Sequence, residues 1–243
     1  MQLATGGDML NFGYWDNAQD PVAAQNKLCS LVGGIGEFGS ARWLVDVGSG
    51  LAAPAAQWKS AYASIEICCV NINFEQLLSA RQASVSMLNA TSTVLPLSDG
   101  SADRIVALES AQHFRPLDKF IKESRRVLEP GGLLVIAMPV MARVHPFFKL
   151  GILSLTWSSE HYELEYVKSV IEDNGFEIRD VRHIGHQVYE PLTNYYARNR
   201  ASLREKILKK YPAFLENILY RSLLKMSDVS KKEIIDYVVI KAV

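Results

Sequence analysis

The feature that most constrains the fold is a stretch in which an apolar run ends in an acid and breaks into a glycine-containing loop. Residues 44–53 read Leu-Val-Asp-Val-Gly-Ser-Gly-Leu-Ala-Ala, and Pro54 follows. Proline suits the first turn of a helix, because its φ is already helical and its missing N–H loses no partner there. The stretch predicts a strand, a tight loop and a helix. In a parallel α/β sheet such a loop lies at the carboxyl edge, where backbone N–H groups face a ligand.

The acid in this stretch narrows the class of ligand. Residues 48–53 fit the dinucleotide fingerprint G-x-G-x-x-G/A only loosely. Asp46 stands two places before the first glycine, where a carboxylate repels a pyrophosphate but pairs with an ammonium group. S-adenosylmethionine (SAM) carries an ammonium group and no phosphate. Asp46 therefore favours SAM over a dinucleotide.

Length and composition point to one globular domain over residues 1–243. The 243 residues include 26 basic and 26 acidic side chains, so nothing in the overall charge favours nucleic acid. We find neither a secretory leader nor an apolar run of about 18 residues, and we expect no membrane partner. Three cysteines, an odd number, suit a reducing compartment, so we expect a cytoplasmic protein. No group of His, Asp and Glu residues has the spacing of metal ligands, and we expect no metal.

Strand and helix patterns alternate along the chain. We expect strands at residues 44–47, 65–70, 85–90, 104–109, 133–138, 176–183 and 236–242. We expect helices at 21–32, 54–62, 74–81, 117–128 and 160–174, and a long helical stretch at 187–226 before the last strand. This alternation is typical of an α/β fold built on a parallel sheet.

Four motifs resemble those of the class I SAM-dependent methyltransferases, in particular the group that acts on small molecules such as ubiquinone precursors, sterols and natural products. They are the strand and glycine loop at 44–52, Phe-Gly-Tyr-Trp at 12–15, Ala-Leu-Glu-Ser-Ala-Gln-His at 107–113 and Arg-Val-Leu-Glu-Pro-Gly-Gly at 126–132. The resemblance implies a Rossmann-like, doubly wound sheet of seven strands with one antiparallel strand. It also implies an N-terminal lid within residues 1–40 and a helical cap insertion at residues 187–235.

The resemblance assigns the cofactor site residue by residue. Asp46 would hold the ammonium group, and Gly48 and Gly50 would let the backbone approach the cofactor closely. Asn71 stands where the family has an acid for the ribose hydroxyls; an amide accepts one hydrogen bond and donates another. Thr91 stands where an acid contacts the adenine, with Asn89 as the alternative. The other cofactor contacts implied are Tyr14, Ile72, Gln76 and Glu109.

The activity implied is transfer of a methyl group from SAM to an oxygen, nitrogen or carbon atom of a small molecule, with S-adenosylhomocysteine as the product. Such a reaction needs alignment of donor and acceptor and, for some acceptors, removal of a proton. His113 and His145 are the candidate bases, although His113 also fits a structural role or a substrate contact. The substrate contacts implied are Trp15, His113, Phe147, Tyr189 and Tyr195.

Departures from the family pattern leave alternatives open. Ala52, Asn71 and Thr91 replace a glycine and two acids, so the chain could be a SAM-binding scaffold for another reaction, such as cyclisation, or a partner subunit without catalysis. An oxidoreductase ranks third, because Asp46 argues against a dinucleotide. A basic helical stretch at 198–210 fits a cap with a solvated face better than a helix lying on a membrane. The sequence leaves homodimer formation open.

Overall fold

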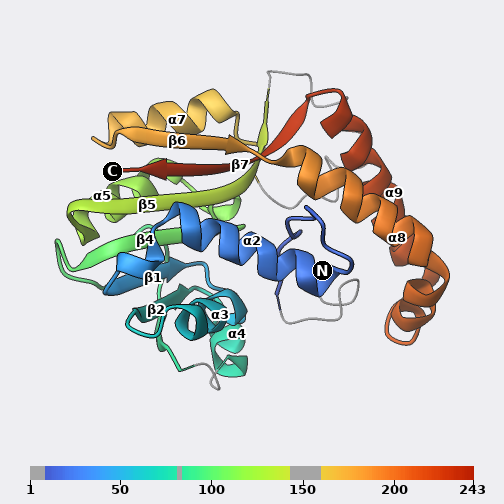
Figure 1. Cartoon of the computed structure of the whole chain (residues 1–243), viewed down its shortest axis with the longest axis horizontal. Coiled ribbons are helices and arrows are strands. Elements are labelled where there is room, and N and C mark those ends of the chain that lie inside the picture. Colours follow the sequence, from blue (N-terminus) through green and yellow to red (C-terminus); the bar gives the residue numbers. More distant parts are fainter. Residues whose placement is uncertain (1–8, 81–83, 143–159) are drawn as a thin grey trace.

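The computed structural model describes residues 9–80, 84–142 and 160–243. Seven strands form one sheet in the order β3-β2-β1-β4-β5-β7-β6, with helices on both faces (Figure 1). β7 runs antiparallel to both of its neighbours, and the other pairs are parallel. The predicted doubly wound sheet with one antiparallel strand is confirmed. The strands are β1 (Trp43–Val47), β2 (Glu66–Asn71), β3 (Ser86–Asn89), β4 (Ala102–Leu108), β5 (Leu128–Met141), β6 (Ile178–His183) and β7 (Ile235–Ala242).

The helices cover the two faces of the sheet as two apolar layers. They are α2 (Pro21–Ile35), α3 (Ala53–Ala61), α4 (Phe74–Ser79), α5 (Leu117–Val127), α7 (Leu164–Asp173), α8 (Gly185–Leu208) and α9 (Ala213–Lys231). Successive residues of a strand point to opposite faces. Leu44 of β1 accordingly packs in the layer of α2, α3 and α8, and Val45 packs in the layer of α5 and α7.

β5 begins five residues earlier than the sequence predicts. Leu128 pairs with Ala102, and the register of β4 and β5 shifts before Leu133 pairs with Arg104. The Pro-Gly-Gly segment therefore forms an irregularity at the start of the strand instead of a separate loop. Gly131 has a φ of +81° there, a conformation that glycine adopts without steric cost.

The N-terminal segment, residues 9–16, is tied to α2 and α8. Gln25 of α2 donates hydrogen bonds to the carbonyls of Met9 (3.0 Å) and Asn11 (2.7 Å). The backbone N–H of Trp15 donates to the carbonyl of Gln187 in α8 (2.8 Å). These bonds hold the segment at the carboxyl end of the sheet, over the region where the site is expected.

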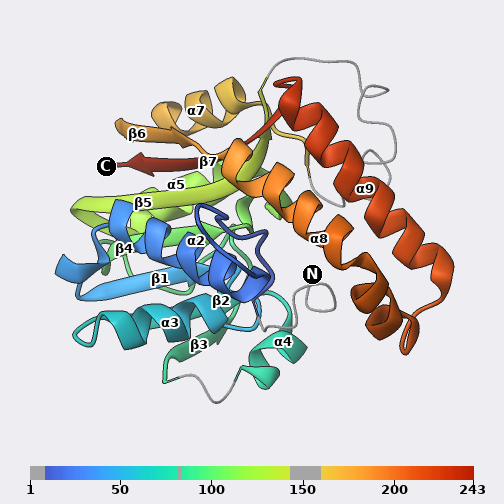
Figure 2. The ribbon, with the colours of Figure 1, turned by 45° about the vertical axis from the view of Figure 1, so that its right-hand side comes forward.

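α8 and α9 form a helical hairpin between β6 and β7. The hairpin leaves the carboxyl end of the sheet and extends away from the body of the molecule (Figure 2). Its two helices pack on each other through Leu203, Ile207 and Leu223, all buried. The helical insertion predicted before the last strand is present, and its role as a cap stays a prediction.

Candidate active site

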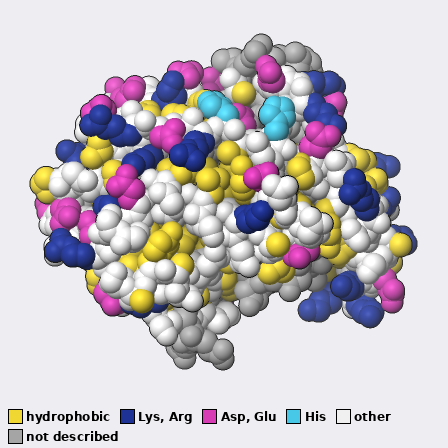
Figure 3. All heavy atoms as spheres, viewed as in Figure 1, with side chains coloured by type: hydrophobic (Ala, Val, Ile, Leu, Met, Phe, Trp, Pro, Cys, Tyr) yellow, Lys and Arg dark blue, Asp and Glu magenta, His cyan; other side chains and the backbone are white. Residues whose placement is uncertain are grey.

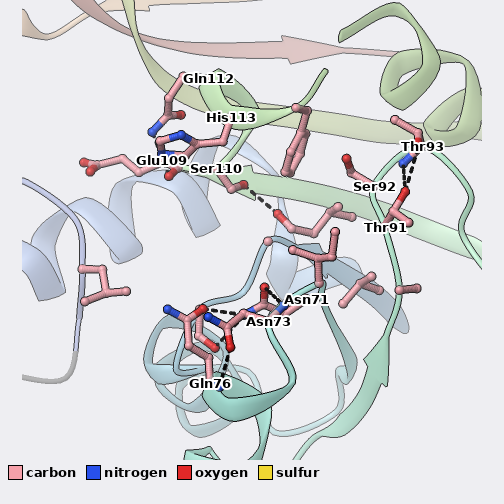
Figure 4. Close-up of a pocket in the computed structure, with 18 of the residues that line it drawn as sticks. Asn71, Asn73, Gln76, Thr91, Ser92, Thr93, Glu109, Ser110, Gln112 and His113 are labelled. Carbon is pink, nitrogen blue, oxygen red and sulfur yellow. Dashed lines mark hydrogen bonds between the residues drawn. The ribbon is translucent and has the colours of Figure 1, made fainter. Parts of the chain in front are cut away.

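A pocket of about 780 Å³ lies at the carboxyl edge of the sheet (Figure 4). Its walls come from the segments that follow β1, β2, β3 and β4, and from Leu10 and Phe12 of the N-terminal segment. A volume of this size accommodates a small-molecule ligand. The edge is the one at which open α/β sheets bind ligands. The lining residues are Leu10, Phe12, Val47, Gly48, Gly50, Val70, Asn71, Ile72, Asn73, Gln76, Ala90, Thr91, Ser92, Thr93, Glu109, Ser110, Gln112, His113, Phe114 and Arg115.

The structure brings many of the residues predicted from the sequence to this pocket, but not all. Those that line it are Gly48, Gly50, Asn71, Ile72, Gln76, Thr91, Glu109 and His113. Those that do not are Tyr14, Trp15, Asp46, Tyr189 and Tyr195. His145 and Phe147 lie outside the described residues.

Asp46 lies beneath the pocket and does not line it. The residue is 2% exposed, and its Oδ2 atom has no hydrogen-bond partner among the described residues. Burial raises the pKa of its carboxyl group to about 7. The sequence predicted a direct contact between Asp46 and an ammonium group. In this structure Asp46 does not line the pocket, so it makes no direct contact with the space that a ligand would fill.

Gly48 is required by the packing of the sheet. Its φ is +77°, its N–H donates to the carbonyl of Val70 (2.7 Å), and a Cβ atom there would lie 2.4 Å from the Cβ of Ser110. Ser110, which follows β4, donates through Oγ to the carbonyl of Val47 (2.6 Å). The sequence ascribed this glycine to close approach of a ligand, whereas the structure fills its side-chain space with Ser110. Gly50 has more room, since its nearest contact is Leu10 Cδ1 at 3.4 Å.

Ala52 is one of the departures from the family pattern, and its backbone conformation shows what the replacement of glycine costs. It has a φ of +57° and precedes the first residue of α3, so it occupies a left-handed position. Glycine adopts that conformation freely, whereas alanine does so at a cost of about 1–2 kcal/mol. Ala52 therefore stands at a position whose backbone conformation favours glycine.

Three amide side chains form one end of the pocket. Asn71 donates through Nδ2 to the carbonyl of Gly50 (3.1 Å) and to Oε1 of Gln76 (2.9 Å), and its Oδ1 accepts from the N–H of Asn73 (3.2 Å). A carboxylate at position 71 would face two acceptor oxygens, so the amide is the group that fits. Both N–H groups of the Asn71 side chain therefore donate to other groups of the protein. Only its oxygen remains for a ribose hydroxyl, against the prediction that it would also donate.

The segment after β3 forms the wall beside these amides. Oγ1 of Thr91 lies 2.6 Å from Oγ1 of Thr93 and accepts from the Thr93 N–H (3.0 Å), which shapes a tight polar turn. Asn89, the alternative to Thr91, instead donates to the carbonyls at positions 71 and 72 and does not line the pocket. Ile72 is 74% exposed and offers an apolar surface at the same end.

The opposite end of the pocket is formed by the segment after β4. Glu109 has a φ of +50°, and its Oε1 atom accepts from the N–H of Phe12 (2.8 Å) and from the hydroxyl of Tyr237 (3.0 Å). Burial raises the pKa of Glu109 to about 8. Figure 4 shows Glu109, Gln112 and His113 grouped at this end, across the pocket from the amides. The carboxyl group thus joins the N-terminal segment and β7 to the wall of the pocket.

Gln112 brings an unsatisfied acceptor to this end. It is 5% exposed and donates through Nε2 to the carbonyl of Glu109 (2.8 Å), while its Oε1 atom has no partner among the described residues. Leaving a buried acceptor unpaired costs about 1–3 kcal/mol. A ligand that donates a hydrogen bond would remove that cost.

Three of the aromatic residues predicted at the site lie elsewhere. Tyr189 is fully buried, and its hydroxyl donates to the carbonyl of Asp236 (3.1 Å). Its ring packs against Phe12 at 6.0 Å, so it supports a wall of the pocket from behind. Trp15 and Tyr195 pack together at 5.3 Å beside a separate hollow of about 510 Å³ along α8. The pattern of aromatic residues in the sequence does not distinguish a pocket wall from the core behind it.

Several of the lining residues were not predicted from the sequence, although two of these lie in motifs identified in it. Phe12 belongs to the aromatic N-terminal motif, and Gln112 stands between Glu109 and His113 in the motif after β4. Among the described residues, no three His, Cys, Asp or Glu side chains are placed to hold a metal ion. No described helix has the length and apolar character needed to cross a membrane.

Comparison with known proteins agrees with this geometry. Residues 45–136, which run from within β1 to within β5, match the family model described as a methyltransferase domain. Over residues 45–136 the chain is thus similar to methyltransferase domains. The matched residues contain the glycine loop and the segments that supply most of the pocket lining. Most of the pocket is therefore formed by the part of the chain that matches the family model.

Two curated relatives are methyltransferases. The chain is 33% identical over 141 residues to the methyltransferase GfsG of Streptomyces halstedii, which covers 54% of this chain and 50% of that protein. It is 28% identical over 144 residues to the erythromycin 3''-O-methyltransferase of Saccharopolyspora erythraea, covering 56% and 47%. The chain thus spans about half the length of these two relatives.

The fold extends well beyond the matched domain. The solved structure of the [4+2]-cyclase SpnF superposes with a TM-score of 0.77 at 22% identity and covers 98% of this chain and 88% of that chain. A likeness at this level of identity establishes the fold only. The hairpin of α8 and α9 therefore belongs to an architecture shared with a known protein.

Proposed function

We propose that this chain binds SAM in the pocket at the carboxyl edge of the sheet and transfers its methyl group to a small natural product. The observation that carries the proposal is a pocket with an amide-lined end and an acid-lined end inside a methyltransferase domain. One relative is named as an erythromycin 3''-O-methyltransferase, and this name supports an oxygen nucleophile over nitrogen or carbon.

Of two buried acceptors without partners in the described part of the chain, the one on Gln112 lines the pocket and fits the ammonium group of SAM, whereas the one on Asp46 does not line the pocket. The Oε1 atom of Gln112 and the Oδ2 atom of Asp46 both lack partners among the described residues. SAM carries an ammonium donor and a positive sulfonium. Burial raises the pKa of both Asp46 and Glu109; a cationic ligand would favour their ionised forms, whereas a phosphate-bearing ligand would oppose them.

The amide end fits the adenosine part. Ile72 supplies an exposed apolar surface for a flat ring. Gln76 lines the pocket, and its Nε2 group makes no hydrogen bond within the described part of the chain, so it can donate to a ribose oxygen. Asn71 contributes its oxygen as an acceptor.

SAM, when bound, supplies a methyl group already activated by its sulfonium. The chain's contribution is to align donor and acceptor and to exclude water, for which Leu10 and Phe12 form an apolar wall. His113 lines the acid end of the pocket, and we assign it the removal of the proton from an attacking hydroxyl.

Calorimetric titration with SAM and with S-adenosylhomocysteine tests the binding step. We expect micromolar affinity in the wild type and at least a tenfold loss in Ile72→Asp, about 1.4 kcal/mol. Val94→Asp is the matched control, because Val94 is also an exposed aliphatic residue (69%) but does not line the pocket. Failure of either ligand to bind the wild type would contradict the proposal.

Transfer of a labelled methyl group from SAM to a panel of hydroxylated natural products tests the chemical step. We expect His113→Ala to lower turnover by about 100-fold or more while SAM affinity is unchanged. Binding of SAM together with conversion of an acceptor that gains no label would instead favour the scaffold alternative, with cyclisation as an example.

A further inference from the structure

The end of the α8–α9 hairpin carries a concentration of positive charge. We define the hairpin tip as residues 204–215, which include the end of α8 and the start of α9. Lys206, Lys209 and Lys210 are exposed there, and their side chains make no ion pair or hydrogen bond with any described residue. Glu205 is the one exposed acid of the tip. The chain as a whole has 26 basic and 26 acidic residues, so this excess of positive charge is local.

Exposed apolar side chains lie among these lysines. Leu208, Tyr211, Phe214 and Leu215 are 39–60% exposed. They are four of the eleven large apolar residues that are well exposed in the described part of the chain, gathered within eight positions. Scattered apolar residues on a surface are ordinary, whereas such a group marks a binding surface.

The hairpin does not need these apolar residues for its own packing. Glu216 is fully buried between the two helices and accepts hydrogen bonds from Arg200 (2.9 and 3.0 Å) and from the hydroxyl of Tyr196 (3.2 Å). Leu203 and Ile207 fill the interior beside it. The hairpin is therefore closed by other groups, and the tip residues are left for an external partner.

The shape of the tip indicates the kind of partner. The hairpin projects from the body of the molecule (Figures 1 and 2), and Lys and Arg side chains gather at its end (Figure 3). We propose that the tip docks on an anionic lipid surface, with Phe214 and its apolar neighbours at the level of the headgroups and the lysines against lipid phosphates. Lysines next to aromatic and leucine side chains suit that interface.

The charges argue against a second copy as the partner. A symmetric contact between two tips would bring both sets of lysines together, and like charges across an interface are repulsive. The sequence favoured a cap whose basic face is solvated over a helix that lies on a membrane. The proposal differs, because the sequence could not show that the apolar residues at 208–215 are exposed and not packed inside the hairpin. It does not depend on the proposed activity.

Co-sedimentation of the full chain with lipid vesicles tests the proposal. We expect binding to vesicles of phosphatidylcholine with phosphatidylglycerol, at least tenfold weaker binding to phosphatidylcholine alone, and release as salt rises. Phe214→Ser, and separately the double change Lys209→Glu with Lys210→Glu, should each weaken binding about tenfold.

Matched controls separate the tip from general effects of charge and exposure. Phe74→Ser removes another exposed phenylalanine (55%), and Lys119→Glu with Lys122→Glu makes the same charge change on α5. These variants should bind as the wild type does. Equal binding to neutral and anionic vesicles, or equal losses in tip and control variants, would overturn the proposal. So would a dimer in sedimentation velocity that Phe214→Ser abolishes, since the tip would then serve a second copy.

Discussion

The ends of β1 and β4 lie side by side in the sheet, and each carries an acid whose pKa is raised by burial. For Asp46 the pKa is about 7 and for Glu109 about 8. Asp46 is covered and keeps an oxygen without a partner among the described residues, whereas Glu109 lines the pocket and accepts two hydrogen bonds. The glycine loop after β1 thus lies over a buried acid, whereas the segment after β4 places its acid in the wall of the pocket.

The largest expected effect tests whether the first glycine serves packing. We expect Gly48→Ala to lower the free energy of unfolding by about 3 kcal/mol or more, because its Cβ would collide with Ser110 at 2.4 Å. Gly50→Ala should cost only about 1–2 kcal/mol, since its φ is also positive but its nearest contact is 3.4 Å away. Urea unfolding measures both free energies. Equal losses of stability in the two variants would contradict the claim that Gly48, unlike Gly50, is required by packing against Ser110.

A second prediction concerns the bonds that Glu109 makes. Glu109→Ala leaves the N–H of Phe12 and the hydroxyl of Tyr237 without their acceptor, at a cost of about 2 kcal/mol in unfolding free energy. Glu109→Gln retains an acceptor oxygen and should cost less. Chemical denaturation checks the order. A loss in Glu109→Gln as large as that in Glu109→Ala would mean that the charge matters more than the bonds.

The third prediction uses pH. Because both carboxyl groups have a raised pKa in the folded state, the folded protein holds protons that the unfolded chain has released. The free energy of unfolding should therefore fall as pH rises from about 4 to about 8, by up to about 1.4 kcal/mol per pH unit for each group. Asp46→Asn should flatten the part between about pH 4 and 7. An unchanged slope in Asp46→Asn would show that its carboxyl group keeps an ordinary pKa.

Much of the fold could be predicted because its signals are local. The run at 44–47 and the glycines after it specify a strand and a turn whatever surrounds them. The start of β5 was wrong by five residues, because Leu128 joins the sheet only through its pairing with Ala102, a contact that no local pattern reveals.

The site was harder to predict, because the direction of a side chain depends on distant neighbours. Asn71 turns its N–H groups toward Gly50 and Gln76, and Tyr189 turns inward toward Asp236. The glycine requirement at position 48 comes from Ser110, sixty-two positions later in the chain. A motif indicates which residues gather at a strand end, and only the packing decides which of them face the pocket.

A crystal structure of the chain with S-adenosylhomocysteine tests the central claim most directly. We predict the ligand in the pocket between the two polar ends, with its adenosine part near Ile72 and Gln76, its amino-acid part near Gln112, and Asp46 still covered by the loop after β1. A ligand bound in the hollow beside Trp15 and Tyr195, or an ammonium group placed directly on Asp46, would contradict this account.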